Sequence, residues 1–131
     1  MEPVRVMLAT IAVTFFTFTD GAMSQTAIPI SVSLTNYAFT PSVLNLKAGI
    51  TYRMHFTNDG SKEHNFNAPE FFAASQVTPA DRGKVEEGSV ELDSGQAIDL
   101  TVTPSRAGSY SFDCSHFMHS MLGMHGKIAV Q

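Results

Sequence analysis

The feature of this sequence that most restricts its fold is a series of short segments in which apolar and polar residues alternate one by one. Such alternation covers residues 30–35, 52–57, 90–93 and 98–103. Because successive side chains of a β-strand point to opposite faces, each segment indicates a strand with one buried face. Further apolar segments at 43–46, 110–114 and 128–130 have strand length, and Gly, Pro and Asn residues separate them. The pattern predicts an all-β sandwich or barrel.

Residues 69–88 interrupt the alternation of apolar and polar residues. Residues 69–76 include Phe71 and Phe72, and we expect a short helical turn there with both rings packed into the core or against the loop. Residues 77–88 are polar and charged and contain proline and glycine, so we expect a surface loop.

The N-terminus resembles an export signal. Arg5 precedes an apolar run at 6–18, and small residues lead to the cleavage expected after Ser24. The run is shorter than the ~20 apolar residues that comfortably span a bilayer, although retention as a membrane anchor is an alternative. We therefore predict a signal peptide at 1–24, a single domain at 25–131, and a periplasmic location.

The chain has one cysteine, Cys114, so it cannot form an internal disulfide. In an exported protein, an unpaired cysteine needs a reason such as metal binding, an intermolecular bridge or a reactive thiol. Nucleic acid is not an expected partner, because the net charge is −4 and no run of Lys and Arg occurs.

The loop at 114–126 concentrates metal-binding side chains, with one cysteine, three histidines and three methionines. Thiolate, imidazole and thioether are soft ligands, and a His₂Cys site with a weak axial methionine is the copper arrangement used for electron transfer. The loop supplies the cysteine, one histidine and the methionine, so a second histidine must come from elsewhere. His64, just after the strand at 52–57, is the best candidate.

Three motifs together resemble the cupredoxins, the family of plastocyanin, azurin and pseudoazurin. They are Cys114-x₄-His119-x₄-Met124 followed by Gly126 and a last strand, the preceding Gly108-x-Tyr110-x-Phe112-x-Cys114, and the upstream pair His64-Asn65. The resemblance covers residues 28–131 in the family's order. The C-terminal motif is highly specific, whereas a His-Asn pair alone would be weak.

The resemblance implies a Greek-key β-sandwich of eight or a similar number of strands, with one type 1 copper ion at one end. It implies four copper ligands, the in-plane His64, Cys114 and His119 and the axial Met124. It also implies that Asn65 ties the two ligand loops together by bonding to Ser115, since such contacts orient ligands and tune the metal.

The loop departs from the family pattern through surplus ligand types. His116 competes with His119, but Cys114-x-His116 leaves little chain to wrap around one ion, and His125 directly follows Met124 and can point away. The remaining accessory metal candidates are the thioethers Met118 and Met121, which we otherwise expect in an apolar rim. No proline lies between Cys114 and His119, where relatives often have one.

We predict a carrier of single electrons, not an enzyme, that docks transiently with a redox protein as a monomer and has no small-molecule substrate. The alternative is a periplasmic copper chaperone or copper-sequestering protein that uses the surplus His and Met residues. A Cys–His nucleophile and a sandwich without metal are less favoured, since neither gives the methionines a role. Zinc and iron–sulfur sites usually require more cysteines.

Overall fold

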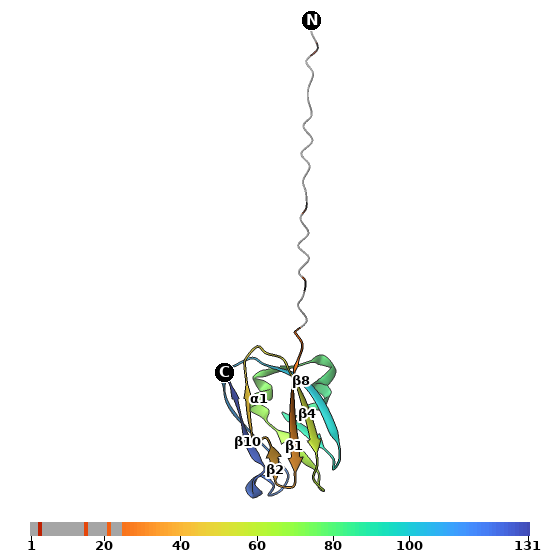
Figure 1. Ribbon diagram of the computed structural model, residues 1–131, viewed down its shortest axis with the longest axis vertical. Coiled ribbons are helices and arrows are strands. Elements are labelled where there is room, and N and C mark those ends of the chain that lie inside the picture. The colour runs from red at the N-terminus through yellow and green to blue at the C-terminus, as the bar shows by residue number, and fades with distance from the viewer. Residues whose placement is uncertain (1–2, 4–14, 16–20, 22–24) are drawn as a thin grey trace.

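Two sheets packed face to face make up the computed structural model of the chain, which describes residues 3, 15, 21 and 25–131 (Figure 1). One sheet has the order β2 (Ala38–Thr40), β1 (Ile28–Thr35), β4 (Tyr52–Asn58), β8 (Ala97–Pro104) and β6 (Ser75–Val77). The other has the order β3 (Val43–Leu46), β10 (His125–Val130), β9 (Gly108–Asp113), β5 (His64–Asn67) and β7 (Ser89–Leu92). The all-β sandwich prediction is confirmed, with ten strands among the described residues.

Two pairs of strands are parallel, β1 with β4 and β3 with β10, and the remaining pairs are antiparallel. The parallel pairs join segments that are not consecutive in the chain, so longer connections cross between the sheets. This topology places β9 between β10 and β5, so the loop that joins β9 to β10 lies near β5, which carries His64.

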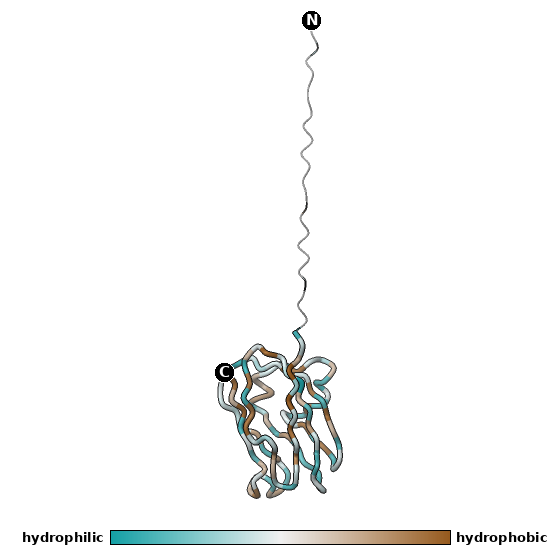
Figure 2. Tube along the Cα trace, viewed as in Figure 1, coloured by the Kyte–Doolittle hydropathy of each residue, from teal (hydrophilic) through white to brown (hydrophobic). Residues whose placement is uncertain are grey.

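The alternating segments bury one face, as their sequence predicts. Val32 and Leu34 of β1 and Met54 and Phe56 of β4 are fully buried, and Val32 lies opposite Phe56 in the parallel register. Along the strands in Figure 2, hydrophilic and hydrophobic residues alternate. Burial of one face of each sheet therefore fixes the strand register, because a slip of one residue would expose the whole apolar set.

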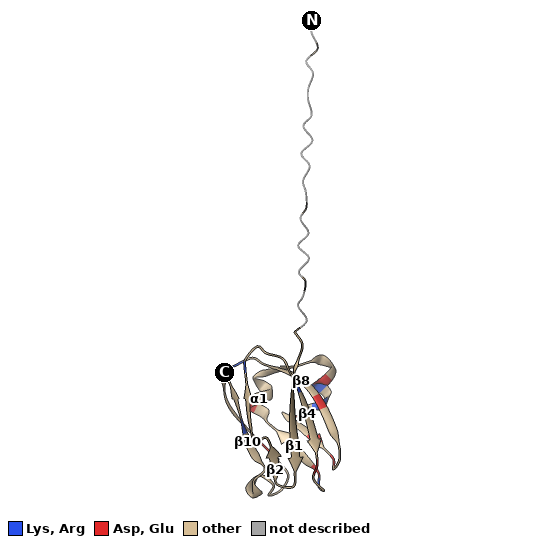
Figure 3. Cartoon of the chain, in the orientation of Figure 1, with Lys and Arg blue, Asp and Glu red and all other residues tan. Residues whose placement is uncertain are grey.

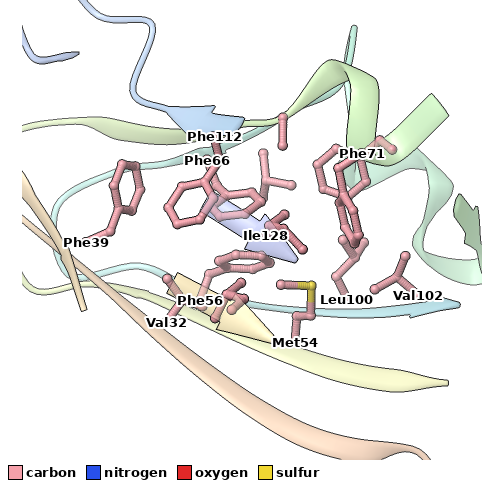
Figure 4. Packing of buried hydrophobic residues seen from close by; sticks show 14 of the residues in the cluster. Val32, Phe39, Met54, Phe56, Phe66, Phe71, Leu100, Val102, Phe112 and Ile128 are labelled. Atoms are coloured by element: carbon pink, nitrogen blue, oxygen red, sulfur yellow. The ribbon is translucent and has the colours of Figure 1, made fainter. Parts of the chain in front are cut away.

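Aromatic rings fill the space between the sheets (Figure 4). The ring centroid of Phe66 lies 4.8 Å from that of Phe56 in the opposite sheet and 4.7 Å from that of Phe112. Phe39 meets Phe112 edge-on at 5.0 Å. Such pairs add roughly 0.5–1.5 kcal/mol each beyond the burial of their area, so this cluster anchors the strands that lead to the candidate site.

The interruption after β5 is more structured than its sequence suggests. A short helix forms as expected, α1 (Pro69–Ala73), and buries Phe71 and Phe72. The surface loop expected at 77–88 is wrong in part, because Val77 ends edge strand β6 and a 3₁₀ helix, η1 (Pro79–Lys84), follows. Proline begins η1 with its φ already set for a helix, and its residues carry charges of both signs (Figure 3).

The predicted signal peptide falls on residues 1–24, which lie outside the described residues except for positions 3, 15 and 21, so it stays a prediction. Within the described part of the chain, no helix has the length and apolar character needed to cross a bilayer.

Three connections meet at one end of the sandwich, the lower end in Figure 1. They are the turn between β1 and β2, the loop between β4 and β5, and the loop between β9 and β10, which contains the 3₁₀ helix η2 (Ser120–Leu122). Asn36 links the first two, since it donates a hydrogen bond to Ser61 and accepts one from His64. The neighbouring rings of His64 and His119 link the second and third. The candidate site lies where they converge.

Candidate metal centre

Cys114 directly follows β9 and is fully buried. Its backbone N–H donates to the carbonyl of Met124 at 3.1 Å, and the N–H of Met124 donates to the carbonyl of His119 at 3.1 Å. The loop therefore closes on itself and brings three predicted ligands together. Gly126 lets strand β10 pack closely just beyond the loop, because a Cβ atom there would overlap the ring of Phe112 and the Ser42 carbonyl.

His64 begins β5 and is also fully buried. Its Nε2 lies 3.1 Å from Oδ1 of Asn36. A carboxamide oxygen only accepts hydrogen bonds, so this contact places the proton on Nε2 and leaves the lone pair of Nδ1 facing inward. Gly60 makes room for the contact, since a Cβ atom there would come within 2.6 Å of Asn36 Oδ1 and 3.0 Å of His64 Nε2.

The two imidazoles and the thiol converge on one point. Nδ1 of His64 lies 3.2 Å from Nδ1 of His119, and the Sγ of Cys114 lies 3.4 Å from His119 Nδ1 and 3.9 Å from His64 Nδ1. The centre of this triangle lies about 2 Å from each corner, close to the ~2.0–2.3 Å bonds that a divalent transition metal forms with imidazole and thiolate. The three side chains thus fit one ion without rearrangement.

Burial favours the neutral form of the two histidines and opposes ionisation of the cysteine. Burial lowers the pKa of His64, and the neighbouring His119 and His116 lower it further. Burial also lowers the pKa of His119. Both histidines therefore favour the neutral form that binds metal. Burial raises the pKa of Cys114, so the thiol keeps its proton until a cation replaces it.

The axial ligand expected from the sequence is Met124. Its side chain is fully buried, and its backbone bonds to Cys114 and His119 hold it at the same end of the sandwich. Thiolate, thioether and two imidazoles form a soft donor set that suits copper.

Asn65 makes the contact with Ser115 that the resemblance implies. Its Oδ1 accepts the backbone N–H of Ser115 at 2.8 Å, and its Nδ2 donates to the Ser115 hydroxyl at 2.7 Å. Nδ2 also lies 3.1 Å from Oε2 of Glu91. Asn65 follows the predicted ligand His64, and Ser115 follows the predicted ligand Cys114. Their hydrogen bonds therefore join the two segments that carry these ligands.

The surplus loop side chains are not corners of the triangle. His116 directs Nε2 to Glu91, and His125 is exposed at the start of β10. The side chains of Met118 and Met121 are 46% and 81% exposed, so they line the surface beside the site as an apolar rim.

Sequence reasoning missed Asn36 and Glu91, which hold His64 and His116. Asn36 belongs to a turn of β1–β2, and no motif spacing connects it to the ligands. Glu91 occupies a polar position of an alternating strand, where a solvated carboxylate is the ordinary expectation.

The chain is similar to known proteins in sequence and in fold. A family model for the cupredoxin-like domain matches residues 7–130. The chain is 28% identical over 117 residues to the copper-resistant cuproprotein CopI of Rubrivivax gelatinosus, covering 86% of this chain and 70% of that protein.

Solved structures share the fold at low sequence identity. Auracyanin from Roseiflexus castenholzii superposes with a TM-score of 0.60 at 20% identity, covering 80% of this chain and 98% of that one. Auracyanin B gives 0.59 at 21% identity over 80% and 89% of the two chains. A multicopper oxidase from Campylobacter jejuni gives 0.56 at 13% identity over 79% of this chain but 30% of its own. With a family model that spans nearly the whole sequence and a sandwich shared with these proteins, the chain belongs to the cupredoxin-like domain family.

Proposed function

We propose that this protein holds one copper ion between His64, Cys114 and His119, with Met124 as a weak axial ligand, and carries single electrons between redox partners. The observation that carries the proposal is the triangle of Nδ1, Nδ1 and Sγ atoms, in which His64 and Cys114 are fully buried and whose centre suits one ion. When bound, copper supplies one-electron chemistry by alternating between Cu(II) and Cu(I).

The chain contributes a site that is fixed before the ion arrives. Asn36 holds the ring of His64, and Asn65 holds the segment that follows Cys114. Loading the site removes the Cys114 proton, since the thiolate is the form that binds metal. Ligands held by such contacts move little when the charge of a bound ion changes, which favours fast electron transfer.

The surface beside His119 suits a transient partner. Four exposed apolar side chains of the same loop form the rim of the site, and they are Phe117, Met118, Met121 and Leu122. His119 itself is only half-buried, so electrons can pass through its ring. Small interfaces of this kind are typical of redox encounters. We propose a redox protein as the partner, a monomeric carrier, and no small-molecule substrate or catalytic residue.

The predicted signal peptide supports a periplasmic location, where a single domain without disulfides is free to diffuse between partners. Cleavage after Ser24 is part of this proposal. It is tested by mass spectrometry of the protein recovered from the periplasm of an expressing bacterium.

A spectroscopic titration tests the copper site. We expect one equivalent of Cu(II) to give the purified protein an intense visible thiolate-to-copper band, and the Cys114→Ser variant to lack it. His125→Gln is a matched control, because this exposed histidine lies outside the triangle, and it should keep the band. Colourless binding by the unchanged protein would overturn the proposal.

Copper handling is the second candidate function, favoured by the likeness to a protein described as a copper-resistant cuproprotein and by the exposed thioethers of Met118 and Met121. The two candidate functions predict different rates of copper release. A carrier keeps its copper through repeated reduction by ascorbate and oxidation by ferricyanide, whereas a chaperone releases Cu(I) rapidly to a competing chelator such as bathocuproine disulfonate.

A further inference from the structure

We propose that Glu63, Glu91 and His116 form a second metal site on the surface, which takes a divalent transition-metal ion and prefers Cu(II). One ligand-type atom from each of these side chains lies within 4.8 Å of the other two. The three residues come from separate segments, namely the loop before β5, strand β7 and the loop after β9. This proposal goes beyond the buried site and uses none of its ligands.

The site is partly organised by contacts outside it. Glu91 lies opposite Asn65 in the register of β5 and β7, and Asn65 Nδ2 lies 3.1 Å from Glu91 Oε2. The other carboxylate oxygen of Glu91 contacts Nε2 of His116. Asn65 also bonds to Ser115, the residue before His116. The side-chain amide of Asn65 therefore helps to position both Glu91 and His116.

Two carboxylates meet at this position. Carboxylates that lie this close repel one another. A divalent ion would cancel both negative charges. Glu63 and Glu91 are exposed and His116 is half-buried, so an ion can reach them without local unfolding.

The donor types select the ion and its oxidation state. Imidazole and carboxylate bind divalent first-row metals, and for such sites affinity is highest for Cu(II). The trio offers no sulfur, so it lacks the soft ligands that favour Cu(I). The buried centre offers the sulfur of Cys114, with Met124 at the same end of the sandwich, and differs in this respect. We therefore expect the protein to hold two copper ions when Cu(II) is abundant.

A Cu(II) titration followed by electron paramagnetic resonance tests the proposal. In the unchanged protein we expect a second equivalent to bind after the thiolate band is complete, with the wide copper hyperfine splitting of a tetragonal nitrogen and oxygen site. Glu63→Gln and His116→Gln should each weaken this second binding by ~10-fold or more and leave the thiolate band unchanged. His125→Gln, which alters an exposed histidine of the same loop, should keep both ions.

Three results would overturn the proposal: binding of a single ion, a second ion with unchanged affinity in His116→Gln or Glu63→Gln, or loss of the second ion in His125→Gln. Thermal unfolding of each metal-free variant checks that it folds. Failure of the buried site is recognised separately, because it removes the thiolate band while the dependence of the surface ion on Glu63 and His116 remains measurable.

Discussion

The side chain of Asn65 and residue Ser115 are joined by two hydrogen bonds across 50 positions of sequence. The Ser115 backbone N–H donates to Asn65 Oδ1 at 2.8 Å, and Asn65 Nδ2 donates to the Ser115 hydroxyl at 2.7 Å. Asn65 is only 4% exposed. The contact therefore fastens the loop that begins at Cys114 to strand β5, which carries His64.

Replacing Asn65 with alanine should destabilise the metal-free protein by roughly 1–3 kcal/mol, because two hydrogen bonds to Ser115, worth roughly 0.5–1.5 kcal/mol each, would be lost. Denaturant unfolding measures the change. Ser115→Ala is the matched control, since it removes the hydroxyl bond but keeps the backbone bond to Asn65. It should cost clearly less, and an equal cost in the two variants would contradict the role given to the backbone bond.

Asn36 should control how well His64 binds metal. Asn36→Ala removes the oxygen that accepts from His64 Nε2 and frees the ring to rotate or change tautomer. We expect copper affinity to fall by roughly 10- to 100-fold, the range usual for partners of ligating histidines. Competition with a chelator of known affinity measures this.

Ser61→Ala is the control for that experiment. It removes the hydroxyl that accepts from Asn36 Nδ2 but leaves the contact between Asn36 and His64. Its copper affinity should stay close to that of the unchanged protein. If both variants bind equally well, Asn36 does not position the ligand.

The fold was largely predictable because burial of one strand face leaves a period of two in the sequence. Val32 with Leu34, and Met54 with Phe56, are fully buried as their alternation indicates. Strand β6 was missed for a physical reason. It has three residues at a sheet edge, none of them fully buried, so no face-specific pattern marks it.

The candidate site was predictable where its residues are close in sequence or belong to a motif of the family resemblance, as His64 and Asn65 do. The spacing from Cys114 to Met124 fits one loop, and the structure places that loop against His64. Residues that reach the site only through the pairing of distant strands could not be predicted from the sequence. Glu91 meets Asn65 because of the register between β5 and β7, and nothing in the local sequence of either strand encodes that pairing.

Asp81 should make stability depend on pH. Its carboxylate accepts from Lys84 Nζ at 2.6 Å, from the Thr101 backbone N–H at 2.9 Å and from the Thr78 hydroxyl at 3.0 Å. The bond from Lys84 is the main cause of a pKa below the usual value. A lowered pKa in the folded state stabilises the protein above the unfolded value of ~3.9, and this stabilisation is lost as pH falls through the folded pKa.

Asp81→Asn should therefore reduce the free energy of unfolding by about 1–2 kcal/mol near pH 7, and the difference from the unchanged protein should shrink in acid. Urea unfolding at pH 7 and at pH 3 measures both values. The exposed Asp93 provides the control Asp93→Asn, which should have little effect at either pH. A cost for Asp81→Asn that grows in acid would contradict this account.

Phe117 should govern contact with a redox partner. Its side chain is 88% exposed two residues before His119, and a large exposed apolar side chain beside a redox site favours docking. Two copies of the protein can meet through this rim, so electron self-exchange between oxidised and reduced protein is a direct probe. We expect Phe117→Ser to keep the copper band but to slow self-exchange several-fold, as measured by NMR line broadening.

Ile28→Ser is the control, because Ile28 is 48% exposed at the start of β1, at the end of the sandwich away from the site (Figure 1). Equal rates in the two variants would show that the rim does not form the contact through which electrons pass.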